Sequence, residues 1–163
     1  FVQPAEHPFE ELLGLYARSI DELDEALTGL SEAEMGLTLD ENSWSIRQIV
    51  HHIADADILF GQHMRVALSS PGTLMGQHVP IGNERYATAA EYRDRPVDSS
   101  VALFRAFHEH ILDIVKYVPD AGEHSIEYRD GQKHTFSQLI HRVAGHSGEH
   151  IDEIWAIRRK YGK

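Results

Sequence analysis

The sequence contains no cysteine among its 163 residues. Disulfides, thiolate metal ligands and a nucleophilic thiol belonging to the protein are therefore excluded. It also lacks any apolar run close to the roughly 18 residues that a membrane-spanning helix needs, and it shows no signal-peptide pattern. We therefore expect no membrane partner, and a cytoplasmic location is the default expectation.

Positive charge is scarce: 15 lysines and arginines face 26 aspartates and glutamates, a formal net charge of −11. A surface this acidic repels phosphate backbones, and the sequence has no basic stripe to offset it. We therefore expect no nucleic-acid partner. The length and a hydrophobic content of 42% are typical of one globular domain with a sizeable core, here residues 1–163.

Four segments carry apolar residues at the three- and four-residue spacing of amphipathic helices. The expected helices run from Phe9 to about Gly29, from Trp44 or Ser45 to about Leu68, from about Ser99 to Tyr117, and from Thr135 or Ser137 to about Tyr161. Ser43 is the expected N-cap of the second helix. This pattern predicts an all-α protein, with a four-helix bundle as its architecture.

The connections differ in character. Residues 72–96 have poor periodicity, with a turn expected at 80–83 and a short helix at about 87–92. A loop of this length in a compact domain is usually functional or mobile. Residues 126–135 flank Asp130-Gly131 and predict a tight turn or a small hairpin.

Histidines interrupt the apolar stripe of the last expected helix. His146 and His150 are four residues apart, so their Cβ atoms lie roughly 6 Å apart on one face and both imidazoles can point at one atom. His141 lies about 140° around the helix from His146 and should point elsewhere. The chain has 12 histidines, so the pair alone is also compatible with interior histidines bonded to carboxylates or carbonyls.

A third candidate ligand lies on the second expected helix. His51 and His52 are about 100° apart there, so they cannot both face the same point. His52 falls inside the apolar band, four residues after Gln48 and three before Asp55. Periodicity therefore favours His52 as the inward residue but leaves His51 open.

Two of these segments resemble a known family. Residues 44–57, Trp-Ser-Ile-Arg-Gln-Ile-Val-His-His-Ile-Ala-Asp-Ala-Asp, resemble the second-helix signature of the DinB-like superfamily, which includes the YfiT-type metal-dependent hydrolases. Residues 145–154, Gly-His-Ser-Gly-Glu-His-Ile-Asp-Glu-Ile, resemble its His-x-x-x-His segment on the fourth helix. The resemblance implies a four-helix bundle of the DinB/YfiT type with unusual connectivity, a homodimer, and a divalent metal held by three histidines.

Carried over to this chain, the implied ligands are His52, His146 and His150. The family position lies just before Ile-Ala-Asp, which favours His52 over His51. Where family members commonly have glutamine this chain has Glu153, and the sequence assigns that residue no role. Three neutral imidazoles suit zinc or nickel first, with iron, cobalt and manganese as further candidates, and they leave a fourth position open as in catalytic sites.

The expected function is that of a metal-dependent enzyme acting on a small molecule. Attack by water would make it a hydrolase, and attack by a thiol would make it a transferase. The resemblance points to a low-molecular-weight thiol of the bacillithiol or mycothiol kind as a possible cofactor, which a chain without cysteine would need from outside. The alternative is a non-catalytic metal- or ligand-binding stress-response module.

Polar residues near the expected ligands are the remaining candidates. Asp55, one turn beyond His52, is the first candidate for a catalytic base, with Glu149 second, although a structural salt bridge would explain either. Both are also candidates to accept the second ring N–H of a ligating histidine. Four arginines could bind an anionic group of a substrate, and nothing in the sequence ranks them: Arg47, Arg85, Arg93 and Arg142.

Overall fold

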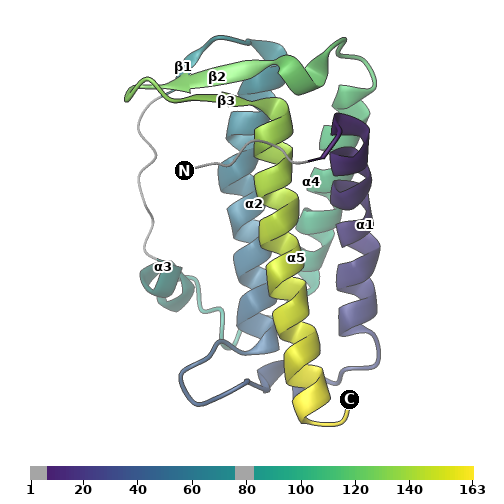
Figure 1. Ribbon diagram of the computed structural model, residues 1–163. Coiled ribbons are helices and arrows are strands. Elements are labelled where there is room, and N and C mark those ends of the chain that lie inside the picture. The colour runs from purple at the N-terminus through teal and green to yellow at the C-terminus, as the bar shows by residue number, and fades with distance from the viewer. Residues whose placement is uncertain (1–6, 76–82) are drawn as a thin grey trace.

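Four long helices make up the body of the protein in the computed structural model, which describes residues 7–75 and 83–163 (Figure 1). The helices are α1 (Phe9–Leu27), α2 (Ile46–Ser69), α4 (Asp98–Val115) and α5 (Phe136–Lys160). They confirm the four-helix bundle, with bounds within a few residues of those expected. Among the described residues, no helix is both long and apolar enough to cross a membrane.

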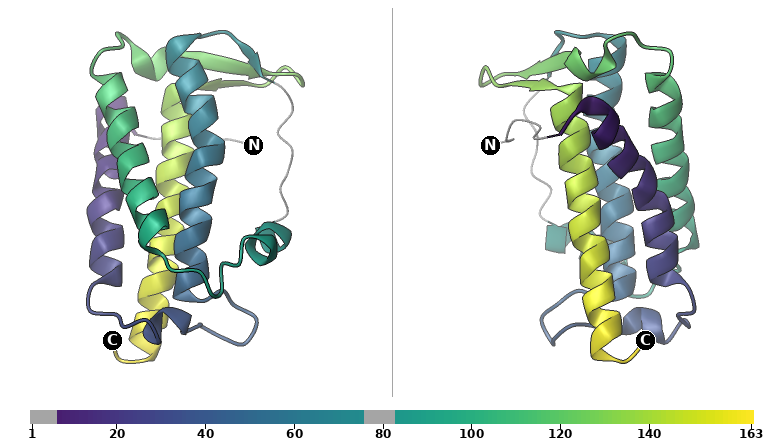
Figure 2. Two further views of the ribbon diagram at one scale, coloured as in Figure 1. Left: turned by 180° about the vertical axis from the view of Figure 1, so that it is seen from behind. Right: turned by 45° about the vertical axis from the view of Figure 1, so that its right-hand side comes forward.

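The order of the helices around the bundle differs from the order along the chain. Helix α1 packs against α4 and α5, and α2 packs against the same two helices, so the consecutive helices α1 and α2 are diagonal (Figures 1 and 2). The long connection between α2 and α4 returns the chain to the end where α2 began, so these two neighbours run parallel. In simple up-down bundles, consecutive helices are antiparallel neighbours. Here the antiparallel neighbours are not consecutive: α1 pairs with α4, and α2 pairs with α5, the two helices that carry the candidate ligands.

A capping box begins each of these two helices. The Ser45 side chain accepts a hydrogen bond from the backbone N–H of Gln48, and the Gln48 side chain accepts one from the backbone N–H of Ser45. Thr135 and Gln138 form the same pair at α5. The expectation that Ser43 caps α2 is therefore wrong, because only the serine three residues before Gln48 can complete the reciprocal pair.

Two clusters of buried apolar side chains fill the bundle. Leu12, Met64, Phe136 and Ile140 belong to the first, and Leu23, Ile49, Ile53, Phe104 and Ile154 to the second. Each fully buried side chain of this size stabilises the fold by about 1.5–3 kcal/mol. Because both clusters contain residues of α2 and of α5, packing holds these two helices in a defined register.

A small sheet covers one end of the bundle (Figure 1). Strands β2 (Ser125–Tyr128) and β3 (Lys133–Thr135) form the expected antiparallel hairpin, with Gly131 at φ 81° in its turn. Strand β1 (Leu74–Met75) pairs in parallel with β2, which the sequence analysis missed because two residues carry no periodicity. Short 3₁₀ turns lie at Glu34–Gly36 and Ala121–Glu123.

The connection between β1 and α4 contains one short helix, α3 (Asn83–Ala89). It begins four residues earlier than the helix expected at about 87–92. Residues 80–82 of the expected turn lie outside the described residues. Helix α3 stands beside the end of the bundle where α2 begins (Figure 1).

Candidate metal centre

Three histidines from two helices converge on one point. His52 of α2 and His146 and His150 of α5 each offer a ring nitrogen, and these atoms all lie within 4.8 Å of one another. Nε2 of His52 is 3.1 Å from Nε2 of His146. The ring centroids are 4.6–5.0 Å apart in all three pairs. The structure therefore brings together the three residues that the sequence analysis selected.

Buried neighbours set the direction of these rings. Ile53 follows His52 and Ile151 follows His150, and both isoleucines lie in the core. Because successive helix residues differ by about 100° in direction, burying the isoleucines leaves the histidines at the edge of the α2–α5 contact. His52 is 9% exposed and the other two are partly exposed, so the cluster lies next to solvent rather than inside the core.

The spacing fits a small divalent ion. Two nitrogens that each lie about 2.0–2.1 Å from a tetrahedral zinc ion are roughly 3.3 Å apart. The 3.1 Å separation of the two Nε2 atoms is close to that value. The set contains imidazoles alone, a donor type that suits zinc, nickel, copper and iron better than magnesium or calcium.

The electrostatics favour neutral ligands. Burial, followed by the charges of His150 and His146, lowers the pKa of His52 to about 3. Burial, followed by the charges of His150 and Arg142, lowers the pKa of His146 to about 4. Both rings are therefore neutral at pH 7, and a metal would not have to displace protons from them.

Comparison with known proteins identifies the family of this chain. The family model described as "DinB superfamily" matches residues 15–154. The chain belongs to the DinB superfamily. The DinB resemblance seen in the two histidine segments is thereby confirmed over most of the chain.

Curated relatives of this DinB protein carry a common description. A protein of Halalkalibacterium halodurans, named "Putative metal-dependent hydrolase", is 28% identical over 131 residues, which cover 79% of this chain and 74% of the relative. A protein of Oceanobacillus iheyensis with the same description is 24% identical over 133 residues, covering 81% and 75%.

Two kinds of solved structure share the fold. YfiT from Bacillus subtilis, described as "a probable metal-dependent hydrolase with an unusual four-helix bundle topology", superposes with a TM-score of 0.83 at 17% identity, covering 98% of this chain and 93% of YfiT. A mycothiol-dependent maleylpyruvate isomerase superposes with a TM-score of 0.69 at 19% identity, covering 91% of this chain and 61% of the isomerase. At these identities the likeness establishes the bundle topology alone.

A carboxylate orients one of the three histidines of the DinB cluster. Nδ1 of His150 lies 2.7 Å from Oε2 of Glu153. The ring donates its Nδ1–H to the carboxylate, which leaves Nε2 to face the cluster, the usual arrangement for metal-binding histidines. Among the described residues, neither Asp55 nor Glu149 bonds to a cluster histidine, so the expected partners are replaced by Glu153. The i, i+3 spacing from His150 was the available signal.

Asp55 has a different neighbour. It accepts a hydrogen bond from the hydroxyl of Tyr92. Burial, followed by this hydrogen bond, raises the pKa of Tyr92, so its hydroxyl stays protonated and serves as a donor. Asp55 lies close to one turn from His52 on α2, and its assignment as a catalytic base stays a prediction.

Trp44, at the start of the 44–57 segment, forms a wall of the site. Its ring meets the His52 ring edge-on, with 4.8 Å between centroids. Its indole N–H donates to Oε1 of Glu84 at 2.6 Å, which connects the site to α3.

His51 and His141 lie outside the cluster. His51 is fully buried, with Nδ1 2.8 Å from Oγ of Ser100 and Nε2 3.0 Å from the carbonyl oxygen of Arg95. Both of its ring nitrogens are thus occupied, and the histidine connects α2 to the start of α4. The ring of His141 instead neighbours that of His7, with 6.2 Å between centroids.

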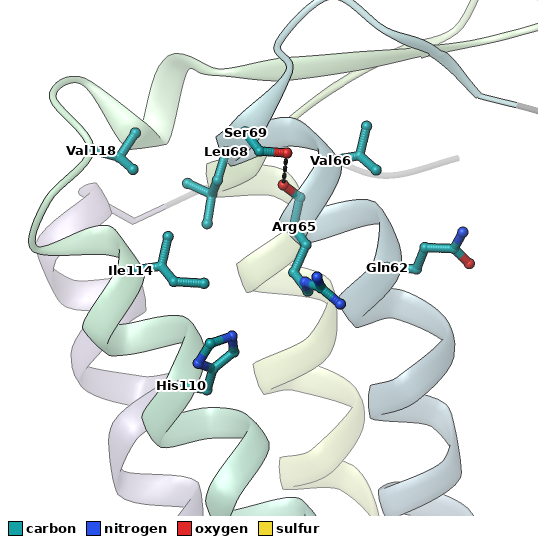
Figure 3. A pocket seen from close by; sticks show the side chains of 8 residues that line it. All are labelled: Gln62, Arg65, Val66, Leu68, Ser69, His110, Ile114 and Val118. Atoms are coloured by element: carbon teal, nitrogen blue, oxygen red, sulfur yellow. Dashed lines mark hydrogen bonds between the residues drawn. The ribbon is translucent and has the colours of Figure 1, made fainter.

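A surface hollow of about 520 Å³ lies elsewhere, between α2 and α4 (Figure 3). Gln62, Arg65, Val66, Leu68, Ser69, His110, Ile114 and Val118 line it. None of the three cluster histidines contributes to this hollow, so it is separate from the metal-type site between α2 and α5.

Proposed function

We propose that this DinB protein holds a divalent metal through His52, His146 and His150 and is an enzyme that activates a nucleophile there for attack on a small molecule. The convergence of three imidazole nitrogens at the edge of the α2–α5 contact carries the proposal. The description of the curated relatives as metal-dependent hydrolases supports it. Zinc and nickel are the first candidates, as the donor set suggests.

The protein groups around the metal have distinct tasks. The three histidines supply neutral donors and leave a fourth position for a water, thiol or substrate atom. Glu153 keeps Nε2 of His150 directed at the cluster. Trp44 shields one side of His52 from water. A bound divalent ion supplies the remaining chemistry, because it lowers the pKa of a bound nucleophile and polarises a carbonyl group.

Two nucleophiles fit this arrangement. With water the protein is a hydrolase, and Asp55 is the residue we propose as its general base. With a thiol it is an S-transferase, and the thiol must come from a cofactor because the chain has no cysteine. The fold likeness to a protein described as a mycothiol-dependent isomerase supports this second candidate.

Elemental analysis of protein purified without a nickel column tests the metal site. We expect about one metal ion per chain in the parent, little in His52→Ala, and parental content in His141→Ala, a histidine variant outside the cluster. A parent that takes up no zinc, nickel or manganese would contradict the proposal.

Activity screens with the identified metal then separate the reaction classes. Turnover without added thiol indicates a hydrolase, and turnover that requires bacillithiol or mycothiol indicates a transferase. Chelation should abolish either activity and the same metal should restore it. A fully loaded protein without turnover across both screens would favour the non-catalytic binding module.

A further inference from the structure

Arg142 places a positive charge beside the histidine cluster. It precedes His146 by four residues on α5, so the two side chains share a face of the helix. Its Cζ lies 5.0 Å from the centre of the Phe60 ring of α2. The Phe60 ring in turn meets the His146 ring at 64°, with 6.3 Å between centroids. Cluster, aromatic ring and cation are therefore consecutive neighbours across α2 and α5.

Arg142 has no acidic partner among the residues that the structure describes. In the segments that the structure describes, no carboxylate lies within ion-pair distance of Arg142, and its side chain is exposed. Other arginines are occupied: Arg47 donates to Glu32, and Arg158 donates to the backbone carbonyl of Ala26. The sequence left Arg47 and Arg142 unranked as candidates to bind an anionic group. The structure favours Arg142, because Arg47 is already paired with Glu32.

The positive charge of Arg142 would repel a divalent cation bound at the histidine cluster. A cation beside a site for a divalent cation costs electrostatic energy. An anionic group bound between the two would offset this repulsion. Such a group also needs a local cation, because the chain as a whole carries −11.

Two polar side chains of the small sheet, Tyr128 and His134, lie close enough to Arg142 for its charge to act on them. The Tyr128 hydroxyl of β2 is 3.1 Å from Nδ1 of His63 on α2, and the Tyr128 ring is 5.0 Å from that of His134 on β3. Burial, followed by the charge of Arg142, lowers the pKa of His134. The charge of Asp130, in the turn between β2 and β3, also acts on both side chains. Among the described residues no ion pair joins Asp130 to Arg142, so the guanidinium group remains available to a bound anion.

We propose that Arg142 binds an oxyanion of the substrate, a carboxylate or a phosphate, while the reacting group lies at the three-histidine cluster. Phe60 packs against the carbon skeleton between the two ends. A guanidinium group fits this task because its planar N–H groups bind carboxylate or phosphate through two parallel hydrogen bonds. The inference rests on the proposed metal function and specifies its substrate class.

Paired metal-binding probes test the assignment on the zinc-loaded protein. Succinic, glutaric and adipic monohydroxamates carry a carboxylate at a graded distance from the metal-binding hydroxamate, and alkyl hydroxamates of the same lengths carry none. Phosphonate-ended hydroxamates form the phosphate arm. We expect at least one anionic probe to bind about ten-fold or more tightly than its uncharged partner, the usual gain from a charge-assisted hydrogen bond.

Two arginine variants provide the comparison. Arg142→Gln should keep its zinc and lose the preference for the anionic probe. Arg159→Gln, which removes the same charge from an exposed position of α5, should keep both. The arm with the larger preference identifies the oxyanion as carboxylate or phosphate.

The outcomes separate the two proposals. Equal affinity for every anionic and uncharged pair on zinc-loaded parent, or a preference that survives in Arg142→Gln, would overturn the role of Arg142 and leave the metal site intact. A parent that cannot be loaded with zinc or another divalent metal would overturn the proposed function, and this inference with it.

Discussion

At the scale of single residues, the contact with Glu153 holds the His150 ring in the orientation that a metal ligand needs. A hydrogen bond to Nδ1 fixes both the tautomer and the ring orientation, so the Nε2 lone pair faces the cluster. Glutamine, which DinB-like proteins commonly have at this position, offers an amide oxygen that can accept the same hydrogen bond. The position therefore requires an acceptor rather than a charge.

Replacing Glu153 should therefore weaken metal binding in a graded way. We expect Glu153→Ala to lower the zinc affinity about 10–100-fold, because the His150 ring loses its orienting acceptor. Glu153→Gln should stay closer to the parent. Competition with a chromophoric chelator measures the affinities, and Glu149→Ala, an exposed carboxylate nearby on α5, is the control. Parental affinity in Glu153→Ala would show that the contact has no part in metal binding.

The lowered pKa values of His52 and His146 predict acid sensitivity of the metal-free protein. Below the ordinary pKa of 6.5 the unfolded chain binds protons at these histidines, whereas the folded chain does not until about pH 3 and about pH 4, respectively. The free energy of unfolding therefore falls as the pH drops from about 6.5 towards 4, by about 1–2 kcal/mol for each histidine after allowance for solvent.

Urea unfolding of chelated protein at pH 7 and pH 5 measures this loss. The double variant His52→Ala/His146→Gln should lose less stability between the two pH values than the parent, because both titrating rings are gone. An identical loss in the two proteins would show that burial of these rings does not control the acid response.

At the scale of elements, the start of α2 is stabilised by a capping pair. The sequence analysis expected the N-cap at Ser43, two residues before the observed Ser45. Ser45 and Gln48 satisfy each other's backbone N–H groups. We expect Ser45→Ala to lower the free energy of unfolding by about 1 kcal/mol, the usual cost of a lost N-cap. Ser43→Ala is the matched control and should change it by less than about 0.5 kcal/mol. Denaturant titrations measure both, and equal losses would contradict the assignment of the cap.

The pairing of elements explains why the three cluster histidines meet at all. In the observed arrangement α2 and α5 are direct neighbours, while α4 and α5, which follow one another among the four long helices, are diagonal. The neighbours of a helix are chosen by the apolar faces of all four helices together. The amphipathic pattern of one helix cannot encode that choice, so the resemblance was needed to join His52 to the pair on α5.

At the scale of the whole molecule, a buried polar network ties three helices together. Nε2 of His108 on α4 lies 2.7 Å from Oδ2 of Asp57 on α2, and its Nδ1 lies 3.0 Å from the carbonyl oxygen of Tyr16 on α1. Each ring nitrogen therefore has a polar partner on a different helix. His108 is fully buried.

Breaking one side of this network should be costly. We expect Asp57→Ala and His108→Ala each to lower the free energy of unfolding by about 3–5 kcal/mol, because each leaves its buried partner uncompensated. The double variant Asp57→Leu/His108→Phe should cost less than the sum of the two single changes, since no unpaired polar group remains. Urea unfolding of all four proteins measures the coupling, and additive losses would contradict it.

The sequence by itself determined the features that obey local rules. Helical periodicity placed the four helices, the i, i+4 spacing paired His146 with His150, and the Asp130-Gly131 turn indicated the hairpin. The family signature selected His52. The homodimer expected from the same resemblance stays a prediction.

Only the tertiary structure decided which residues of different elements contact each other. It placed Arg142 beside the cluster through Phe60 of α2, and it occupied Arg47 with Glu32. It also paired β1 in parallel with β2 across about fifty residues of chain. The physical reason is the same in each case: a side chain's direction follows from its own helix or strand, whereas its partner depends on how distant elements pack.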